Sequence, residues 1–176
     1  MGVSTVTERR LYLLRHAKSS WKDQGLADHD RPLARRGRRA AKAIGRHLRE
    51  QRVAPELVLC STARRARETL EGIEPLPGRG AVRTEPELYG AGPAELLARL
   101  HEIAPRVRSV MVIGHNPALE QLALLLARHG PTVSELEAKF PTGALATLAF
   151  RGPGWAELGR GTAELIDFVR PRDLES

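Results

Sequence analysis

Two histidines in this sequence follow apolar runs and have neighbours that could assist chemistry. Arg15 and His16 close the run at residues 11–15, and His115 lies just beyond the run at 109–113. A neutral imidazole is a nucleophile near pH 7, and a phosphoryl group transferred to it leaves an N–P bond that water can hydrolyse. Arginine suits such chemistry, because its planar guanidinium pairs with two phosphate oxygens at once. The residue types therefore indicate phosphoryl transfer with His16 as the candidate nucleophile.

A phosphoryl group also dictates the charge of its site. It brings about two negative charges, which fixed cations must neutralise as charge shifts in the transition state. Arg15 is one candidate, and Arg65, which follows the apolar run at 56–60, is the second. The adjacent Arg64 and Arg67 are interpreted as solvated surface charges.

Apolar segments alternate with amphipathic ones along the chain, which predicts alternating strands and helices. Strands are expected at 11–15, 56–60 and 109–113, with a weak one near Val82 and others at 144–150 and 163–169. Helices are expected over 35–51, from Ser61 as N-cap to about Glu71, from Pro93, and from Asn116 to near Gly130. Residues 131–142 are expected to be irregular or briefly helical.

This alternation predicts an α/β fold, a three-layer α/β/α sandwich around a mostly parallel sheet. Ligands of such sheets bind beyond the carboxyl ends of the strands. Because Arg15 and His16, residues 61–65 and residues 114–116 all lie at such ends, we expect them to converge. We expect one domain over residues 1–176, with residues 1–10 as a flexible N-terminus.

Composition limits the classes of protein that this chain can belong to. At 176 residues and 41% hydrophobic, the chain can bury one core. No apolar run is long enough for a signal peptide or a membrane span, so a cytoplasmic location without a membrane partner is expected. The single cysteine, Cys60, excludes an intramolecular disulfide and a cysteine-rich metal site.

The net charge of +7 comes almost wholly from arginine and raises the alternative of a nucleic-acid-binding protein. The basic residues are spread along the chain, however, and aromatic residues that could stack on bases make up only 4%. We therefore expect no nucleic-acid partner. The charge fits an arginine-rich surface around a site for an anionic substrate.

Four motifs resemble those of the histidine phosphatase superfamily, and the resemblance as a whole runs from about Leu11 to Phe168. The segment LLRHAKSSW at 13–21 resembles the RHG signature, with alanine in place of glycine as in the SixA-type RHA form. The other three are RPL with a later glycine at 31–37, STARRARET at 61–69, which is similar to S-x-x-x-R-A-x-x-T, and GHN at 114–116, which resembles the late G-H motif.

The resemblance implies a phosphoglycerate mutase-like fold and assigns roles to individual residues. His16 would be the nucleophile, Arg15 and Arg65 the phosphate ligands, and His115 the second histidine of the pocket. No metal ion or other cofactor is implied, because the arginines supply the positive charge. Three further polar residues are expected to contact the phosphate or the leaving group, with an ordinary surface role as the alternative: Ser19, Lys22 and Asn116.

Many relatives carry a general acid in an L-x-E motif, and here that position falls on Gly90. Glu85 or Glu87 could substitute, although a surface role is expected for each. A missing acid fits a leaving group that departs easily, as in a SixA-type phosphatase that acts on phosphohistidine in a protein. The alternatives are a phosphomonoesterase for a small phosphorylated metabolite and a module that binds phosphorylated ligands without turnover.

Overall fold

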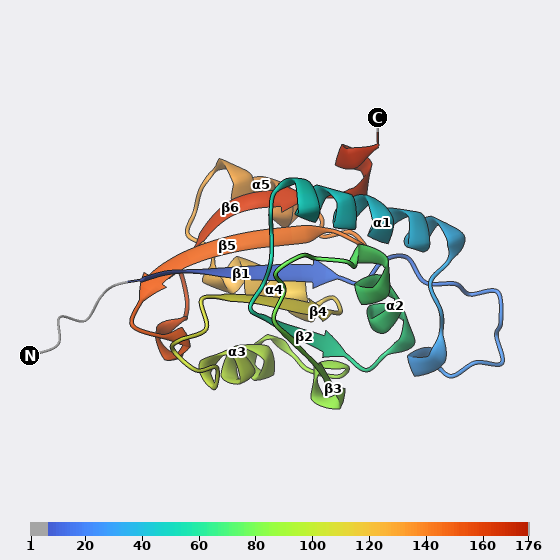
Figure 1. The fold of residues 1–176 in the computed structure, drawn as a ribbon, viewed down its shortest axis with the longest axis horizontal. Helices are drawn as coiled ribbons and strands as arrows, with labels where there is room; N and C mark the ends of the chain where they lie inside the picture. The colour runs from blue at the N-terminus through green and yellow to red at the C-terminus, as the bar shows by residue number, and fades with distance from the viewer. Residues whose placement is uncertain (1–6, 176) are drawn as a thin grey trace, which may run out of the picture.

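The computed structural model describes residues 7–175, which form one six-stranded sheet between two layers of helices (Figure 1). The strand order is β3-β2-β4-β1-β5-β6. The strands are β1 (Thr7–Arg15), β2 (Leu57–Ser61), β3 (Ala81–Glu85), β4 (Ser109–Gly114), β5 (Leu145–Gly152) and β6 (Glu164–Val169). The helices are α1 (Arg35–Glu50), α2 (Arg64–Ile73), α3 (Pro93–His101), α4 (Ala118–Leu126) and α5 (Pro131–Ala138), with short 3-10 turns η1 (Asp28–Asp30), η2 (Pro86–Leu88), η3 (Trp155–Glu157) and η4 (Pro171–Leu174).

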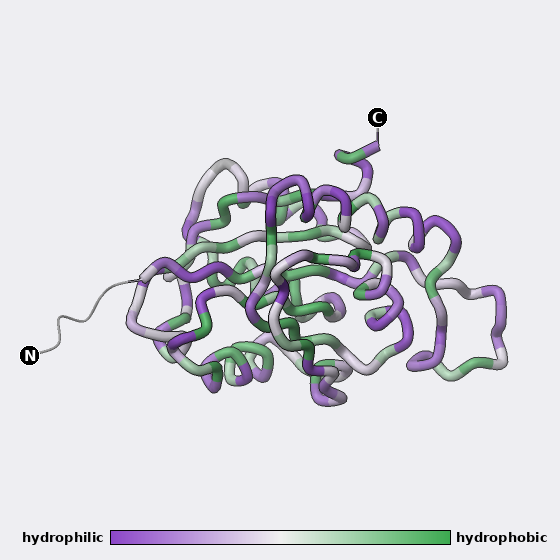
Figure 2. The backbone as a smooth tube through the Cα atoms, viewed as in Figure 1, coloured by the Kyte–Doolittle hydropathy of each residue, from purple (hydrophilic) through white to green (hydrophobic). Residues whose placement is uncertain are grey.

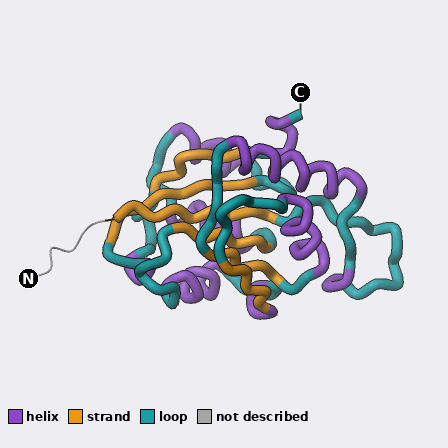
Figure 3. The backbone as a smooth tube through the Cα atoms, in the orientation of Figure 1, coloured by secondary structure: helices purple, strands orange, loops and turns teal. Residues whose placement is uncertain are grey.

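The sheet is mostly parallel, as predicted. Strands β1 and β4, β4 and β2, and β2 and β3 pair in parallel, whereas β5 runs antiparallel to both β1 and β6. The helices lie on both sides of this sheet, and Figure 3 shows the strands enclosed between them.

Alternating side chains of β1 show why both faces are covered. Leu11 and Leu13 belong to the core cluster that holds the apolar residues of α3, α4 and α5. Tyr12 and Leu14 belong to the opposite cluster, with Ile44 of α1 and residues of α2. Successive strand residues point to opposite faces, so an unbroken apolar strand must be buried on both sides. Figure 2 shows hydrophobic residues along the central strands and hydrophilic ones along much of α1. The predicted three-layer sandwich is therefore confirmed.

Three predicted boundaries are wrong. Strand β1 begins at Thr7, so residues 7–10 are not part of a flexible N-terminus, and residues 1–6 lie outside the described residues. Ser61 is not an N-cap but the last residue of β2, and its Oγ accepts a hydrogen bond from the backbone N–H of Ala63, which precedes α2 (3.2 Å). Helix α4 ends at Leu126 because Ala127 is already extended and bridges to Ala163.

Among the described residues, no helix is both long enough and apolar enough to span a bilayer.

The loop after β1 is held closely against the start of α1. Ala34 donates a backbone hydrogen bond to the Lys18 carbonyl (2.8 Å), and Ser19 bridges to Leu33. Gly37 lies directly over this contact, and a Cβ there would overlap the Lys18 carbonyl oxygen. The glycine of the RPL motif is thus required by close approach of two backbone segments.

We therefore expect Gly37→Ala to destabilise the protein by about 1–2 kcal/mol, because the overlap outweighs the higher helix propensity of alanine. Urea unfolding monitored by circular dichroism measures this loss. Gly90→Ala is the matched control, since no neighbouring atom lies within 4 Å of the Cβ it would add. Equal stability of the two variants would contradict the close-approach explanation.

Candidate active site

A cavity of about 330 Å³ lies at the carboxyl ends of β1 and β4. The parallel register of these strands pairs Arg15 with Gly114, so the residues that follow, His16 and His115, are neighbours. Their ring centroids are 5.2 Å apart, close to the spacing between adjacent strands. The two histidine motifs are therefore brought together by strand pairing, as the sequence predicts. The lining residues are Arg15, His16, Lys18, Ser19, Trp21, Arg31, Arg65, His115, Asn116 and Thr142.

The His16 ring is held in one protonation state. It is 7% exposed, and its Nδ1 lies 2.7 Å from the carbonyl oxygen of Ala17. A carbonyl can only accept a hydrogen bond, so Nδ1 carries the proton of the neutral ring and Nε2 keeps its lone pair. The pKa of His16 is lowered to about 3: burial is the largest cause, the hydrogen bond to Ala17 opposes it, and repulsion from His115, Arg65 and Arg15 adds to the lowering. At neutral pH this ring is an uncharged nucleophile.

His115 is a second buried imidazole beside His16. Its Nε2 lies 2.8 Å from Oγ of Ser61, the last residue of β2. Burial, followed by the charge of Arg65, lowers the pKa of His115 to about 4. The ring is therefore neutral near pH 7 and can exchange hydrogen bonds with an oxyanion.

Arg65 is oriented by Asp28 of η1. Its Nη1 donates to the Asp28 carbonyl (2.8 Å) and its Nη2 to Oδ2 (3.0 Å), while Arg31 donates to Oδ1 (3.0 Å). Tyr89 also donates to Oδ2 (2.5 Å). The Tyr89 hydrogen bond, with those from Arg65 and Arg31, holds the pKa of Asp28 well below its usual range. Asp28 therefore stays ionised and positions Arg65 rather than supplying a proton.

Thr69 connects the nucleophile segment to the helix that carries Arg65. The backbone N–H of Ala17 donates to Thr69 Oγ1 (2.9 Å), and that hydroxyl donates to the Arg65 carbonyl (2.7 Å). These contacts give a structural role to both Arg65 and Thr69, the arginine and the threonine of the S-x-x-x-R-A-x-x-T pattern.

Arg15 is held by the backbone before β5. Its Nη1 donates to the Phe140 carbonyl (3.0 Å), which also accepts from Asn116 Nδ2 (2.9 Å). Burial lowers the pKa of Arg15, and the charge of Arg65 lowers it further, although an arginine remains charged. Among the described residues, Arg15 Nε and His115 Nδ1 are buried without a hydrogen-bond partner. Two repelling guanidinium groups would be relieved by an anion between them.

Known proteins with similar sequences and structures identify this arrangement. A model of the histidine phosphatase superfamily (branch 1) matches residues 11–149. The chain belongs to this superfamily. It is a phosphatase of the SixA type, an enzyme that hydrolyses phosphate from its substrate.

Three relatives of this phosphatase cover nearly its whole length. Rv1276c of Mycobacterium tuberculosis is 42% identical over 165 residues, which are 90% of this chain and 100% of that protein. A structure assigned as the phosphohistidine phosphatase SixA of Nakamurella multipartitia is 35% identical, with a TM-score of 0.83 over 94% of this chain and 97% of its own. The protein histidine phosphatase SixA complexed with tungstate is 26% identical, with a TM-score of 0.72 over 94% and 99% of the two chains.

The three further residues predicted to bind phosphate differ in position. Ser19 and Asn116 line the cavity of the phosphatase. Lys22 is exposed and is not among the lining residues, although its neighbour Trp21 is. Lys18 lines the cavity instead.

Neither glutamate named as a substitute acid reaches the cavity of the phosphatase. Glu85 forms two hydrogen bonds with Arg99 (2.8 and 3.0 Å), and Glu87 is exposed. No carboxylate is among the residues that line the cavity. Among the described residues, no group of three His, Cys, Asp or Glu side chains could hold a metal ion.

Sequence reasoning missed several residues of the site. Asp28 and Tyr89 lie outside the four motifs that resemble those of the superfamily, and no spacing signal connects either of them to Arg65. Arg31 was recognised only as part of the RPL motif, although its guanidinium holds Asp28, donates to Ser19 Oγ (2.5 Å) and lies 3.2 Å from the centroid of the Trp21 ring. Its position in that motif is the one signal that could have found it.

The lowered pKa of His16 makes stability depend on pH. Below pH 6.5 the unfolded chain binds a proton at this position, whereas the folded ring does so only near pH 3, so the stability contributed by a neutral ring falls as pH falls. We expect His16→Gln, which cannot titrate, to gain on the order of 3 kcal/mol relative to wild type between pH 6.5 and pH 4. Urea unfolding at several pH values measures the difference. His129→Gln, at an exposed histidine, is the control; a gain of the same size there would contradict the assignment.

Proposed function

We propose that this chain hydrolyses phosphohistidine in a protein, through a phosphohistidine intermediate on its own His16. The observation that carries the proposal is the neutral His16 ring, whose proton is fixed on Nδ1, in a cavity lined by three arginines and, among the described residues, by no carboxylate. A nucleophile and fixed cations are present, but among the described residues no carboxylic acid that could protonate a leaving group lines the cavity.

The reaction proceeds in two displacements at phosphorus. His16 Nε2 attacks the phosphoryl group in line, an N–P bond to His16 forms, and the N–P bond to the substrate imidazole breaks. Arg15 and Arg65 bind the phosphoryl oxygens, and His115 contributes a hydrogen bond. A water molecule then attacks the phosphorus of phospho-His16, and the N–P bond to His16 breaks. Inorganic phosphate leaves, and the neutral His16 ring is regenerated.

The lack of a carboxylate in the cavity favours phosphohistidine over an alkyl phosphate as the substrate. An alcohol leaves as a strongly basic alkoxide unless an acid protonates it. An imidazole that is protonated on its other ring nitrogen leaves as a neutral molecule and needs no such acid. The SixA relative complexed with tungstate supports the oxyanion site, since tungstate, like phosphate, is a tetrahedral oxyanion.

His16→Ala is expected to abolish turnover, and Arg15→Ala or Arg65→Ala to lower it by about two to three orders of magnitude each, because charge stabilisation dominates phosphoryl transfer. Release of inorganic phosphate measures turnover, and labelling with a ³²P phosphodonor tests for an acid-labile adduct on His16. Arg83→Ala, an exposed arginine outside the cavity, is the control. Near-normal turnover by His16→Ala would remove the mechanism, and binding without any adduct or turnover would favour a module that only binds phosphorylated ligands.

A comparison of substrates tests the leaving group. We expect phosphate release from a histidine-phosphorylated protein to exceed release from sugar phosphates and p-nitrophenyl phosphate, measured as kcat/KM at one pH. The opposite ranking would favour a phosphomonoesterase that acts on a small metabolite.

A further inference from the structure

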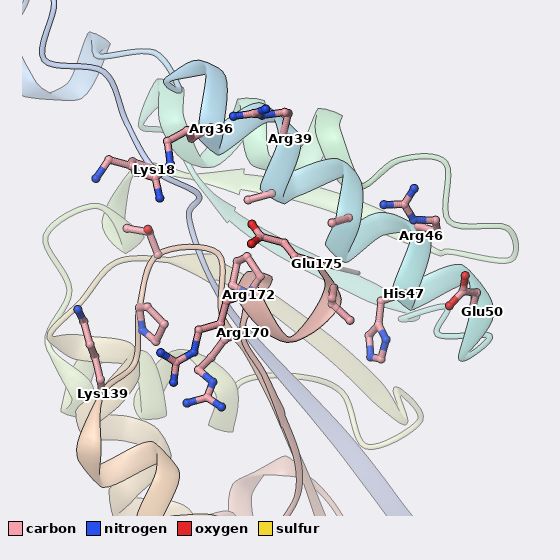
Figure 4. A pocket seen from close by; sticks show the side chains of 16 residues that line it. Lys18, Arg36, Arg39, Arg46, His47, Glu50, Lys139, Arg170, Arg172 and Glu175 are labelled. Atoms are coloured by element: carbon pink, nitrogen blue, oxygen red, sulfur yellow. The ribbon is translucent and has the colours of Figure 1, made fainter.

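A second and larger cavity, of about 1220 Å³, adjoins the catalytic one. It is a groove between one face of α1 and the C-terminal residues around η4; Figure 4 shows Arg36, Arg39 and Arg46 on α1, Arg170 and Arg172 on the C-terminal segment, and Glu175 between the two. We call it the basic groove. Lys18 and Thr142 line both cavities, so the basic groove continues directly from the site that holds His16.

The positive charge of the basic groove is not balanced within the chain. Seven lysine or arginine side chains line it, against two carboxylates, Glu50 and Glu175. Arg170 is paired with Asp173. Within the part of the chain that the structure describes, no side-chain ion pair or hydrogen bond engages the other six cations: Lys18, Arg36, Arg39, Arg46, Lys139 and Arg172.

The start of α1 has more positive charge than an isolated helix favours. Arg35, Arg36, Arg38 and Arg39 lie near its N-terminus, where there is no acidic residue. Cations near the positive end of a helix dipole and like charges three or four residues apart are both destabilising. Two of these arginines line the basic groove, and a bound polyanion would relieve their repulsion.

The length of the basic groove indicates how long an anion must be to fill it. The lining residues of α1 extend from Arg36 to Glu50, about 21 Å along the helix, the length of about six extended residues. A single phosphate or a small metabolite cannot reach from one end to the other. No phenylalanine, tyrosine or tryptophan lines the basic groove, so it offers no ring on which nucleic-acid bases would stack. Alanine and proline side chains lie between the cations, at Ala40, Ala43, Pro141 and Pro171.

We propose that the basic groove docks an acidic segment of the protein substrate, next to its phosphohistidine in space. This rests on the proposed function, and it names the substrate class as a protein with a run of Asp or Glu about six residues long. The docked segment binds equally before and during phosphoryl transfer, so it lowers KM and leaves the chemical step unchanged.

The test compares two peptides that differ only in charge. Each carries one phosphohistidine followed by six residues, which are all Glu in the first and all Gln in the second. The enzyme variants are the triple substitution Arg39→Ala, Arg46→Ala and Arg172→Ala in the basic groove, and the matched control Arg83→Ala, Arg106→Ala and Arg160→Ala. All six arginines are exposed, and the control removes the same net charge outside both cavities.

At low salt, we expect wild type and control to show a KM for the Glu peptide at least tenfold below that for the Gln peptide. The groove variant should lose this preference and keep its kcat, as well as its kcat/KM for free phosphohistidine. A preference that survives in the groove variant, or falls equally in the control, would overturn the docking proposal.

A binding measurement separates this proposal from the proposed function. A fluorescent hexaglutamate should bind to wild type and weakly to the groove variant, and a single-stranded oligonucleotide of equal charge should compete poorly. Stronger binding of the oligonucleotide would overturn the choice of an acidic protein. If wild type hydrolyses neither peptide nor free phosphohistidine, the proposed function fails, and substrate docking fails with it even where hexaglutamate binds. Turnover of both peptides without hexaglutamate binding overturns the docking proposal alone.

Discussion

The site depends on one constraint, the in-register parallel pairing of β1 with β4. That register makes His16 and His115 neighbours with ring centroids 5.2 Å apart, although they are 99 positions apart in the chain. A shift of the register by one residue would move every side chain of β1 to the opposite face of the sheet, where it would meet the other core cluster, so packing on the two faces favours this pairing. The geometry of the two imidazoles is therefore a consequence of core packing rather than of local loop structure.

Burial and positive charge act together on His16. Removing the ring from water disfavours its protonated form, and the guanidinium groups disfavour it again. The same cations that keep the nucleophile neutral also attract the phosphoryl group, so one set of charges serves two steps. Asp28 balances part of this charge while it holds Arg65 in place, and Tyr89 and Arg31 keep that carboxylate ionised.

The sequence predicted the layers and the central residues of the site, because both depend on signals that a linear pattern carries. Apolar runs mark buried strands, and the motif residues follow the ends of those strands. The start of β1 was missed because Arg9 is charged yet 4% exposed, and its guanidinium is paired with backbone carbonyls of residues 105, 152 and 153. The contacts of Asp28 with Arg65 and Tyr89 were missed for a related reason. They join residues 37 and 61 positions apart, and only the folded chain brings them together. Lys22 was misplaced because it is exposed in the connection between β1 and η1, which projects from the body of the protein (Figure 1).

The catalytic cavity lacks a carboxylate among the described residues, and the basic groove lies beside it. Both features concern where on its surface the enzyme gains binding energy from its substrate. A catalytic cavity of about 330 Å³ accommodates a phosphorylated side chain and little more. A phosphohistidine with an easily displaced imidazole needs little help at the leaving group, but its phosphoryl group and ring are the same in every protein that carries one. Discrimination among such substrates must therefore come from contacts outside the cavity. The basic groove begins at Lys18 and Thr142, on the border of the cavity, and is the adjoining surface with the charge to supply those contacts.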